Sequence, residues 1–175
     1  MYRGPVRAEP LAVELHNTLY ADGGELRDGL AADAPGFLSA IADRLPADLP
    51  RGPMPTAAAL TAHRDVVRAA LTGDRRTLRA LNASAARAAA SPSISPALEL
   101  RTNWHGATKA DVVIGAFAAD AIRLLAEGTP LQQCGAPGCV LLYVRDHPRR
   151  QWCSPACGNR ARQARHYAKV VKRLS

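Results

Sequence analysis

The placement of the four cysteines constrains this chain more than any other feature, because all four lie between residues 134 and 157. Cys134 and Cys139 enclose the sequence GAPG, Cys153 and Cys157 enclose SPA, and thirteen residues separate the two pairs. Two close pairs at this spacing are typical of a tetrahedral zinc site with four thiolate ligands. Four thiolates complete the coordination sphere, so we predict one structural zinc ion. Two disulfides in an exported protein, or four unrelated buried thiols, are the alternatives.

The residues between the cysteine pairs predict a knuckle followed by a β-hairpin. The glycines and the proline of GAPG permit the tight turn of a metal-binding knuckle. The run Val140–Val144 favours a β-strand. A turn around Pro148 would then return the chain through residues 151–152, which are expected to form the second arm of the hairpin.

A basic amphipathic helix is predicted after the second cysteine pair. Ser154 followed by Pro155 is typical of a helix start, so Cys157 is expected in the first turn, where the helix dipole favours its thiolate form. Knuckle, hairpin and helix together predict a treble-clef-like finger. One face of the helix carries Arg162, Arg165, Lys169, Lys172 and Arg173, and another flank carries Tyr167, Val170, Val171 and Leu174.

The excess of positive over negative charge lies entirely in the last quarter of the chain. The net charge is +8, but residues 1–130 contain 14 Lys and Arg and 14 Asp and Glu, which cancel. Residues 131–175 contain nine Lys and Arg against Asp146 alone. Such a segment is expected to meet a polyanion, although a solvated helix face is the simpler alternative. The candidate DNA-binding residues are Arg149, Arg150, Arg160, Arg162, Arg165, Lys169, Lys172 and Arg173.

The sequence WCSPACGNRARQARHY resembles the CGNR zinc-finger family, whose tetrapeptide corresponds to residues 157–160. The resemblance covers residues 131–173 and implies a zinc finger. In that family the finger commonly follows an N-terminal ABATE domain, described as a putative stress-induced transcription regulator. The segment LAVELHNTLYADGGELRDGL, with Asn17 and Thr18, resembles the opening of that domain. The hairpin loop YVRDHPRRQW is shorter here than in relatives, so the resemblance does not extend to loop contacts with bases.

The segment before residue 131 predicts a mainly helical domain. Helices are expected over LAVELHNTLYA, over PGFLSAIADRL, after Thr56 and over residues 78–88. The sequence SPSISP is expected to be irregular, and ALELR is expected to begin a short strand or hairpin. The last helix is predicted to start with a capping box at Thr108 and Asp111. Its expected buried stripe is Val113, Ile114, Phe117, Ala121 and Leu125. The predicted fold is therefore mainly α (α+β).

Two domains are predicted, a helical domain over residues 1–130 and the finger over residues 131–175, with the helical domain folding without zinc. The five histidines show no paired metal-binding spacing, and we find no nucleophile elbow or phosphate loop, so no enzymatic activity is expected. No apolar run is long enough to span a membrane, and we expect a cytoplasmic protein.

We predict a zinc-dependent transcriptional regulator that contacts duplex DNA through its basic helix. The helical domain would sense a small-molecule effector or form a homodimer. A zinc-stabilised protein-interaction module, or a finger that binds RNA, is the alternative.

Overall fold

The computed structural model describes residues 2–174, with side chains as far as Val171. Six α-helices and three two-stranded antiparallel hairpins form this part of the chain. The helices are α1 (Leu11–His16), α2 (Gly29–Ala40), α3 (Ala57–Leu71), α4 (Leu78–Ala86), α5 (Lys109–Ala126) and α6 (Pro155–Leu174), with short 3₁₀ helices at Ala42–Arg44 and Arg75–Thr77. The hairpins pair β1 (Leu19–Asp22) with β2 (Glu25–Asp28), β3 (Ala90–Ile94) with β4 (Leu100–Trp104), and β5 (Leu131–Gln133) with β6 (Leu142–Val144). The predicted mainly α fold is confirmed.

The core of the molecule is built around α1, which packs against α3 and α5. All of α1 except Leu11 is buried, including the polar residues Glu14 and His16. Phe37 of α2 stacks on Phe117 of α5, with 6.2 Å between ring centroids. Burying side chains of this size contributes about 1.5–3 kcal/mol each. The short α1 therefore owes its helical state to the helices around it.

Helix α5 confirms most of the predicted pattern. The side chain of Thr108 accepts a hydrogen bond from the Asp111 backbone N–H, and the Asp111 carboxylate accepts one from the Thr108 N–H, so the capping box is present. The predicted register is wrong at the end of the helix, where Leu124 is buried and Leu125 is exposed. An α-helix turns 100° per residue, so a stripe extrapolated over three turns easily misses by one position.

The sequence-based prediction is least accurate at the hairpins. SPSISP, expected to be irregular, supplies most of β3, which pairs with β4 from Ala90 opposite Trp104 to Ile94 opposite Leu100. A proline is tolerated in β3 because both strands of a two-stranded sheet are edge strands. The turn at Gly23 and Gly24 joins β1 to β2, a hairpin that the sequence analysis did not predict. Helix α2 begins at Gly29, six residues before the expected Pro35.

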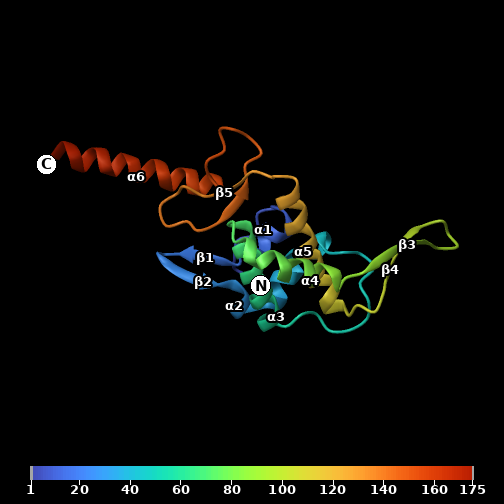
Figure 1. Ribbon diagram of the computed structural model, residues 1–175. Coiled ribbons are helices and arrows are strands. Elements are labelled where there is room, and N and C mark those ends of the chain that lie inside the picture. The colour runs from blue at the N-terminus through green and yellow to red at the C-terminus, as the bar shows by residue number, and fades with distance from the viewer. Residues whose placement is uncertain (1, 175) are drawn as a thin grey trace.

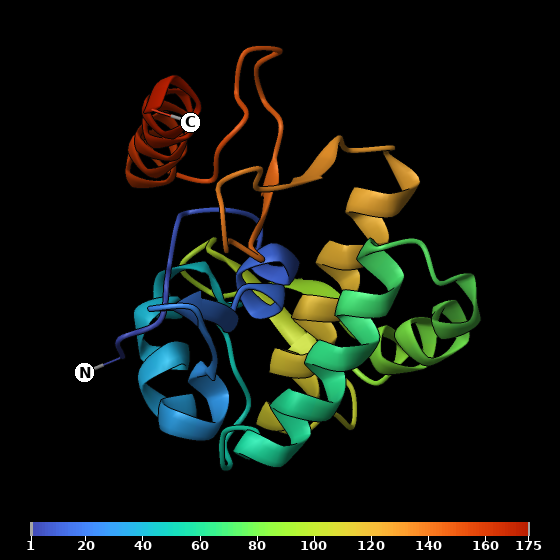
Figure 2. The same cartoon turned by 90° about the vertical axis from the view of Figure 1, so that its left-hand side faces the viewer.

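The finger lies at one end of the helical body, next to α1 (Figure 2). Helix α6 projects from the finger away from the body, and the β3–β4 hairpin projects from the opposite side (Figure 1).

The Thr56 cap of α3 is confirmed, since its side chain accepts a hydrogen bond from the Ala59 N–H. No helix in the described part of the chain is long and apolar enough to cross a membrane.

Candidate metal centre

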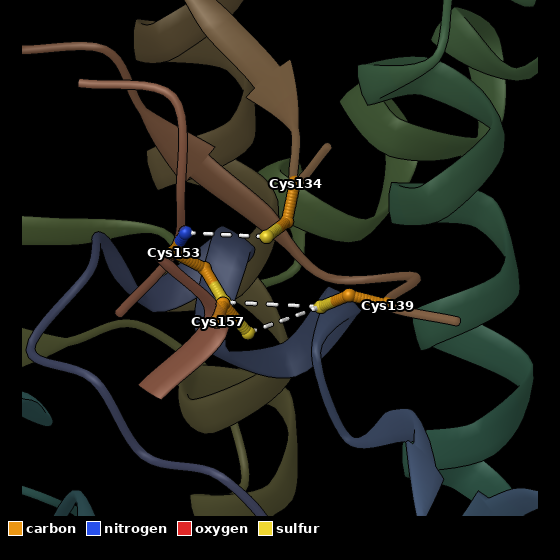
Figure 3. A group of neighbouring side chains, drawn as sticks. All are labelled: Cys134, Cys139, Cys153 and Cys157. Carbon is orange, nitrogen blue, oxygen red and sulfur yellow. Dashed lines mark hydrogen bonds between the residues drawn. The ribbon is translucent and has the colours of Figure 1, made fainter. Parts of the chain in front are cut away.

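The four cysteines converge on one point, and their Sγ atoms all lie within 4.8 Å of one another (Figure 3). The Sγ of Cys153 lies 3.5 Å from that of Cys157 and 3.8 Å from that of Cys139, and the Cys139 and Cys157 sulfurs are 3.9 Å apart. A zinc–sulfur bond of about 2.3 Å gives a tetrahedron with edges of about 3.8 Å. The sulfurs are too far apart for disulfides, which need about 2.05 Å. The donor set fits a single structural zinc ion.

The β5–β6 hairpin presents the first two ligands, because the knuckle forms its tip. The Cys134 N–H donates to the Leu141 carbonyl at 2.9 Å, and the Cys139 N–H donates to the Ala136 carbonyl at 3.0 Å. The predicted hairpin is present, but its partner strand is Leu131–Gln133 rather than residues 151–152. The returning segment makes one backbone contact with the knuckle, from the Gly135 N–H to the Gln151 carbonyl at 3.4 Å.

Helix α6 presents the other two ligands at its N-terminus, as predicted. The Ser154 hydroxyl accepts a hydrogen bond from the Cys157 N–H at 3.3 Å and so caps the helix. The Cys153 N–H donates to the Sγ of Cys134 at 3.4 Å, which links the two cysteine pairs directly (Figure 3). Backbone N–H groups that point at sulfur favour the thiolate form, which is the form that binds a metal.

The thiols perturb one another strongly because three of the four are buried. The hydrogen bond from Cys153 lowers the pKa of Cys139 to about 5. The same interaction, together with burial, raises the pKa of Cys153, and burial raises the pKa of Cys134. In the absence of a cation, the thiols whose pKa is raised therefore stay protonated. A divalent ion neutralises the thiolates and cross-links the knuckle to α6, which is the chemistry that zinc supplies here.

The residues after Cys157 each have a structural role. A Cβ atom on Gly158 would lie 3.0 Å from the Trp152 indole, and one on Gly135 would lie 3.2 Å from the same ring. The indole thus fits between the knuckle and the helix because both positions are glycine. Asn159 accepts a hydrogen bond from Arg162, and Arg160 donates to the Sγ of Cys157 at 3.3 Å. Trp152 is a packing residue that the spacing of the cysteines alone did not identify.

The finger is joined to α1 by backbone hydrogen bonds from an asparagine side chain. Asn17, just after α1, donates from Nδ2 to the Leu142 carbonyl and accepts at Oδ1 from the Leu142 N–H, both at 2.9 Å. Asn17 is fully buried, and Leu142 belongs to the same apolar core as the helices. The contact therefore joins residues on the two sides of the predicted domain boundary at residue 130. The division into two domains stays a prediction.

A second junction between the finger and the helical body is formed by a buried carboxylate. Glu9 Oε2 accepts from the Val144 N–H at 2.9 Å, and Glu9 Oε1 pairs with the Arg150 guanidinium at 2.5 Å. Arg150 also lies over the Tyr143 ring, 4.8 Å from its centroid, and donates to the Val144 carbonyl. Glu9 is 5% exposed, so this ion pair is largely shielded from water.

The predicted DNA-binding residues fall into three groups. Arg150 is engaged in the contacts with Glu9, and Arg160 contacts the metal-binding sulfur. Lys172 and Arg173 lie outside the described side chains. The remaining candidates are exposed: Arg149 in the loop after β6, and Arg162, Arg165 and Lys169 along α6.

Residues 131–170 match the family model described as the CGNR zinc finger. The match spans the β5–β6 hairpin, the four cysteines and most of α6. The comparison with curated proteins gives no match. The finger prediction is therefore confirmed for this part of the chain, and the residues before it are not covered by the match.

Proposed function

We propose that the protein is a transcriptional regulator that binds duplex DNA through the exposed basic face of α6. The observation that carries the proposal is a long basic helix, fixed at one end by a metal centre and extending away from the rest of the molecule (Figure 1). A projecting helix of this kind has room to enter a groove of duplex DNA.

The charge of the finger supports a polyanionic partner. The sequence of α6 contains no Asp or Glu, and Arg162, Arg165 and Lys169 follow one another at spacings of three and four residues. With four thiolates and one divalent ion included, residues 131–175 still carry a net charge of +6. Contacts with phosphates supply most of the affinity of such a surface, and base-edge contacts supply specificity.

The exposed residues divide these roles. Arg165 and Lys169 are assigned to phosphates. Arg162 is the better candidate for a base edge than Arg160, because Arg160 contacts the metal-binding sulfur of Cys157, whereas Arg162 contacts the exposed side chain of Asn159. Lys172 and Arg173 continue the same face in the sequence. Arg150 anchors the finger to the helical body and is placed outside the contact surface.

The helical body is assigned a role in sensing or dimerisation rather than in contacting DNA. We identify residues 1–130 with the ABATE-like domain suggested by Asn17 and Thr18, acting in the cytoplasm as a sensing or dimerising domain. A single small finger covers only about 600–1,000 Å² of protein surface, which gives little sequence discrimination. A homodimer would double the number of bases contacted.

The test is a salt series with the double variant Arg165→Glu and Lys169→Glu. Each neutralised phosphate contributes about −0.9 to the slope of log affinity against log salt, so the variant should flatten the slope by roughly two or lose binding. The matched control is Arg75→Glu with Arg79→Glu, an exposed pair at the same spacing on the helical body. Zinc content should be unchanged in both variants.

Three outcomes would reject the proposal. Unchanged DNA affinity in the Arg165 and Lys169 variant would leave the basic face as a solvated surface and favour a protein-interaction module. Tighter binding to structured RNA than to duplex DNA would favour an RNA-binding finger. An equal loss of affinity in the control pair would show that net charge, rather than α6, determines binding.

A further inference from the structure

A cavity of about 530 Å³ lies between α2 and the start of α3, away from the metal centre and the basic helix. Its lining is mainly apolar and includes Leu30 and Leu38 of α2 and Met54 and Pro55 of the loop before α3. This volume is within the range of about 300–1,000 Å³ that small-molecule sites occupy.

The cavity exists because α2 is kinked and lined with small side chains. Pro35 lies inside α2, and the backbone at Asp33 is non-helical, so the helix is divided into two halves that both line the cavity. Asp33 Oδ1 accepts from the Gly36 N–H at 2.8 Å and so restarts the second half. The remaining space is left by five alanines, whose methyl groups fill little of it: Ala31, Ala32, Ala34, Ala42 and Ala57.

The shape and chemistry of the lining select the occupant. Thirteen residues line the cavity, fewer than the roughly 20–30 residues that each side of a stable protein–protein interface contributes. Asp33 is the charged residue among them, and the lining is otherwise mainly apolar, so a charged ligand would lose its hydration there without compensation. Met54 is 42% exposed at the rim, and its flexible side chain can adapt to different shapes. We propose that this cavity binds a small, mainly apolar molecule that carries no negative charge.

The wall of the cavity is linked to an ion pair between the half-buried Asp28 and the buried Arg64. The Asp28 carboxylate caps α2 by accepting from the Leu30 N–H at 3.0 Å and the Ala31 N–H at 3.2 Å, and both residues line the cavity. The same carboxylate receives two hydrogen bonds from Arg64 of α3, at 2.7 and 2.8 Å. Arg64 is 3% exposed, so the first turn of α2 cannot move without disturbing this pair.

The first turn of α2 is also connected to the finger. The Gly29 N–H donates to the Thr18 carbonyl at 2.8 Å. Thr18 directly follows Asn17, whose side chain holds both backbone groups of Leu142 in β6. The Gly29–Thr18 hydrogen bond and the two hydrogen bonds between Asn17 and Leu142 therefore connect the first turn of α2 with β6, the strand that follows the knuckle. Occupancy of the cavity acts on the finger through this route.

The inference is tested on the zinc-loaded full chain by ¹H–¹⁵N NMR titration with N-phenyl-1-naphthylamine, a neutral apolar dye. Saturable shifts are expected at the amides of Leu30, Ala31 and Ala57, with smaller ones at the Asn17 side-chain amide and at Leu142. Ala31→Trp, at an exposed position of the lining, should abolish them by filling the cavity. Ala119→Trp, at an exposed position of α5 outside the lining, should leave them unchanged.

The outcomes separate the two parts of the inference. If no saturable shift is seen, or if the Ala31→Trp variant binds the dye as well as the wild type, the cavity is not a ligand site. Because a folded spectrum is needed to interpret that variant, Ala57→Trp serves as a second blocking substitution from α3. Shifts confined to α2 and α3, with Asn17 and Leu142 unmoved, would overturn the link to the finger. None of these readouts depends on DNA binding.

Discussion

Asn17 and Leu142 are 125 residues apart in the sequence, yet they exchange two hydrogen bonds of 2.9 Å in the manner of paired strand residues. The asparagine side chain takes the place of a neighbouring strand and satisfies both backbone groups of a buried β6 residue. An unsatisfied buried backbone group costs about 1–3 kcal/mol, so this side chain is expected to stabilise the junction of the finger with α1.

Replacing Asn17 should therefore weaken the whole molecule. Asn17→Ala leaves the Leu142 N–H and carbonyl without partners and is expected to lower the free energy of unfolding by on the order of 2 kcal/mol. Asn17→Asp keeps the acceptor and loses the donor, so its free energy of unfolding should also be lower than that of the wild type. Urea unfolding of the zinc-loaded protein measures both. A stability equal to the wild type for Asn17→Ala would mean that water replaces the lost bonds.

The neighbouring Arg149 and Arg150, in the loop after β6, should behave differently. Arg150→Met leaves the buried Glu9 carboxylate without its ion-pair partner, and a loss on the order of 2 kcal/mol is expected, less than for a fully buried pair because Arg150 is 27% exposed. Arg149→Met removes an exposed charge and should change stability by less than about 0.5 kcal/mol. Thermal unfolding of the two variants at equal zinc occupancy compares them. Equal losses would contradict the anchoring role of Arg150.

Removal of zinc should unfold the finger before the helical body. One equivalent of zinc is expected per chain by elemental analysis, and Cys157→Ser should lower it because one of four thiolates is lost. A chelator is expected to reduce the helical signal of α6 first and to leave α1 to α5 folded but less stable, since Leu142 then leaves their core. Circular dichroism during chelation should show two steps. A single step would place the finger and the body in one cooperative unit.

Two buried histidines should make the protein less stable as the pH falls. Burial lowers the pKa of both His16 and His63 to about 4, against about 6.5 in the unfolded chain. Their contribution to stability is complete above pH 6.5, and the unfolded state takes up more protons between pH 6.5 and 4. Stability should fall there by up to about 1.4 kcal/mol per pH unit for each histidine.

The variant His63→Leu isolates one of these contributions. His63 Nε2 is buried and has no hydrogen-bond partner among the described residues, so leucine should stabilise the protein even at neutral pH. The advantage over the wild type should grow as the pH falls from 6.5 to 4, whereas loss of zinc affects both proteins alike. A pH-independent difference between the two unfolding curves would contradict the assigned pKa.

Local patterns in the sequence were sufficient for the elements that depend on near neighbours. The capping box at Thr108 and the helix start at Ser154 each follow from residues within a few positions of one another, and the ligand role of the four cysteines follows from two close pairs in one short segment. The basic character of α6 is likewise a property of its composition. These features form because short-range hydrogen bonds and metal coordination act in any fold that contains them.

Only the tertiary structure decided which residues connect distant parts of the chain. By its place in the sequence Arg150 belongs with the other cations of the finger and Glu9 has no evident role, because nothing local pairs residues 141 positions apart. The same is true of the β5–β6 pairing and of the cavity at the α2 kink, which depends on α3 approaching from outside. Burial sets these outcomes: a carboxylate or an amide placed in an apolar interior must find a partner, and the fold determines which one is within reach.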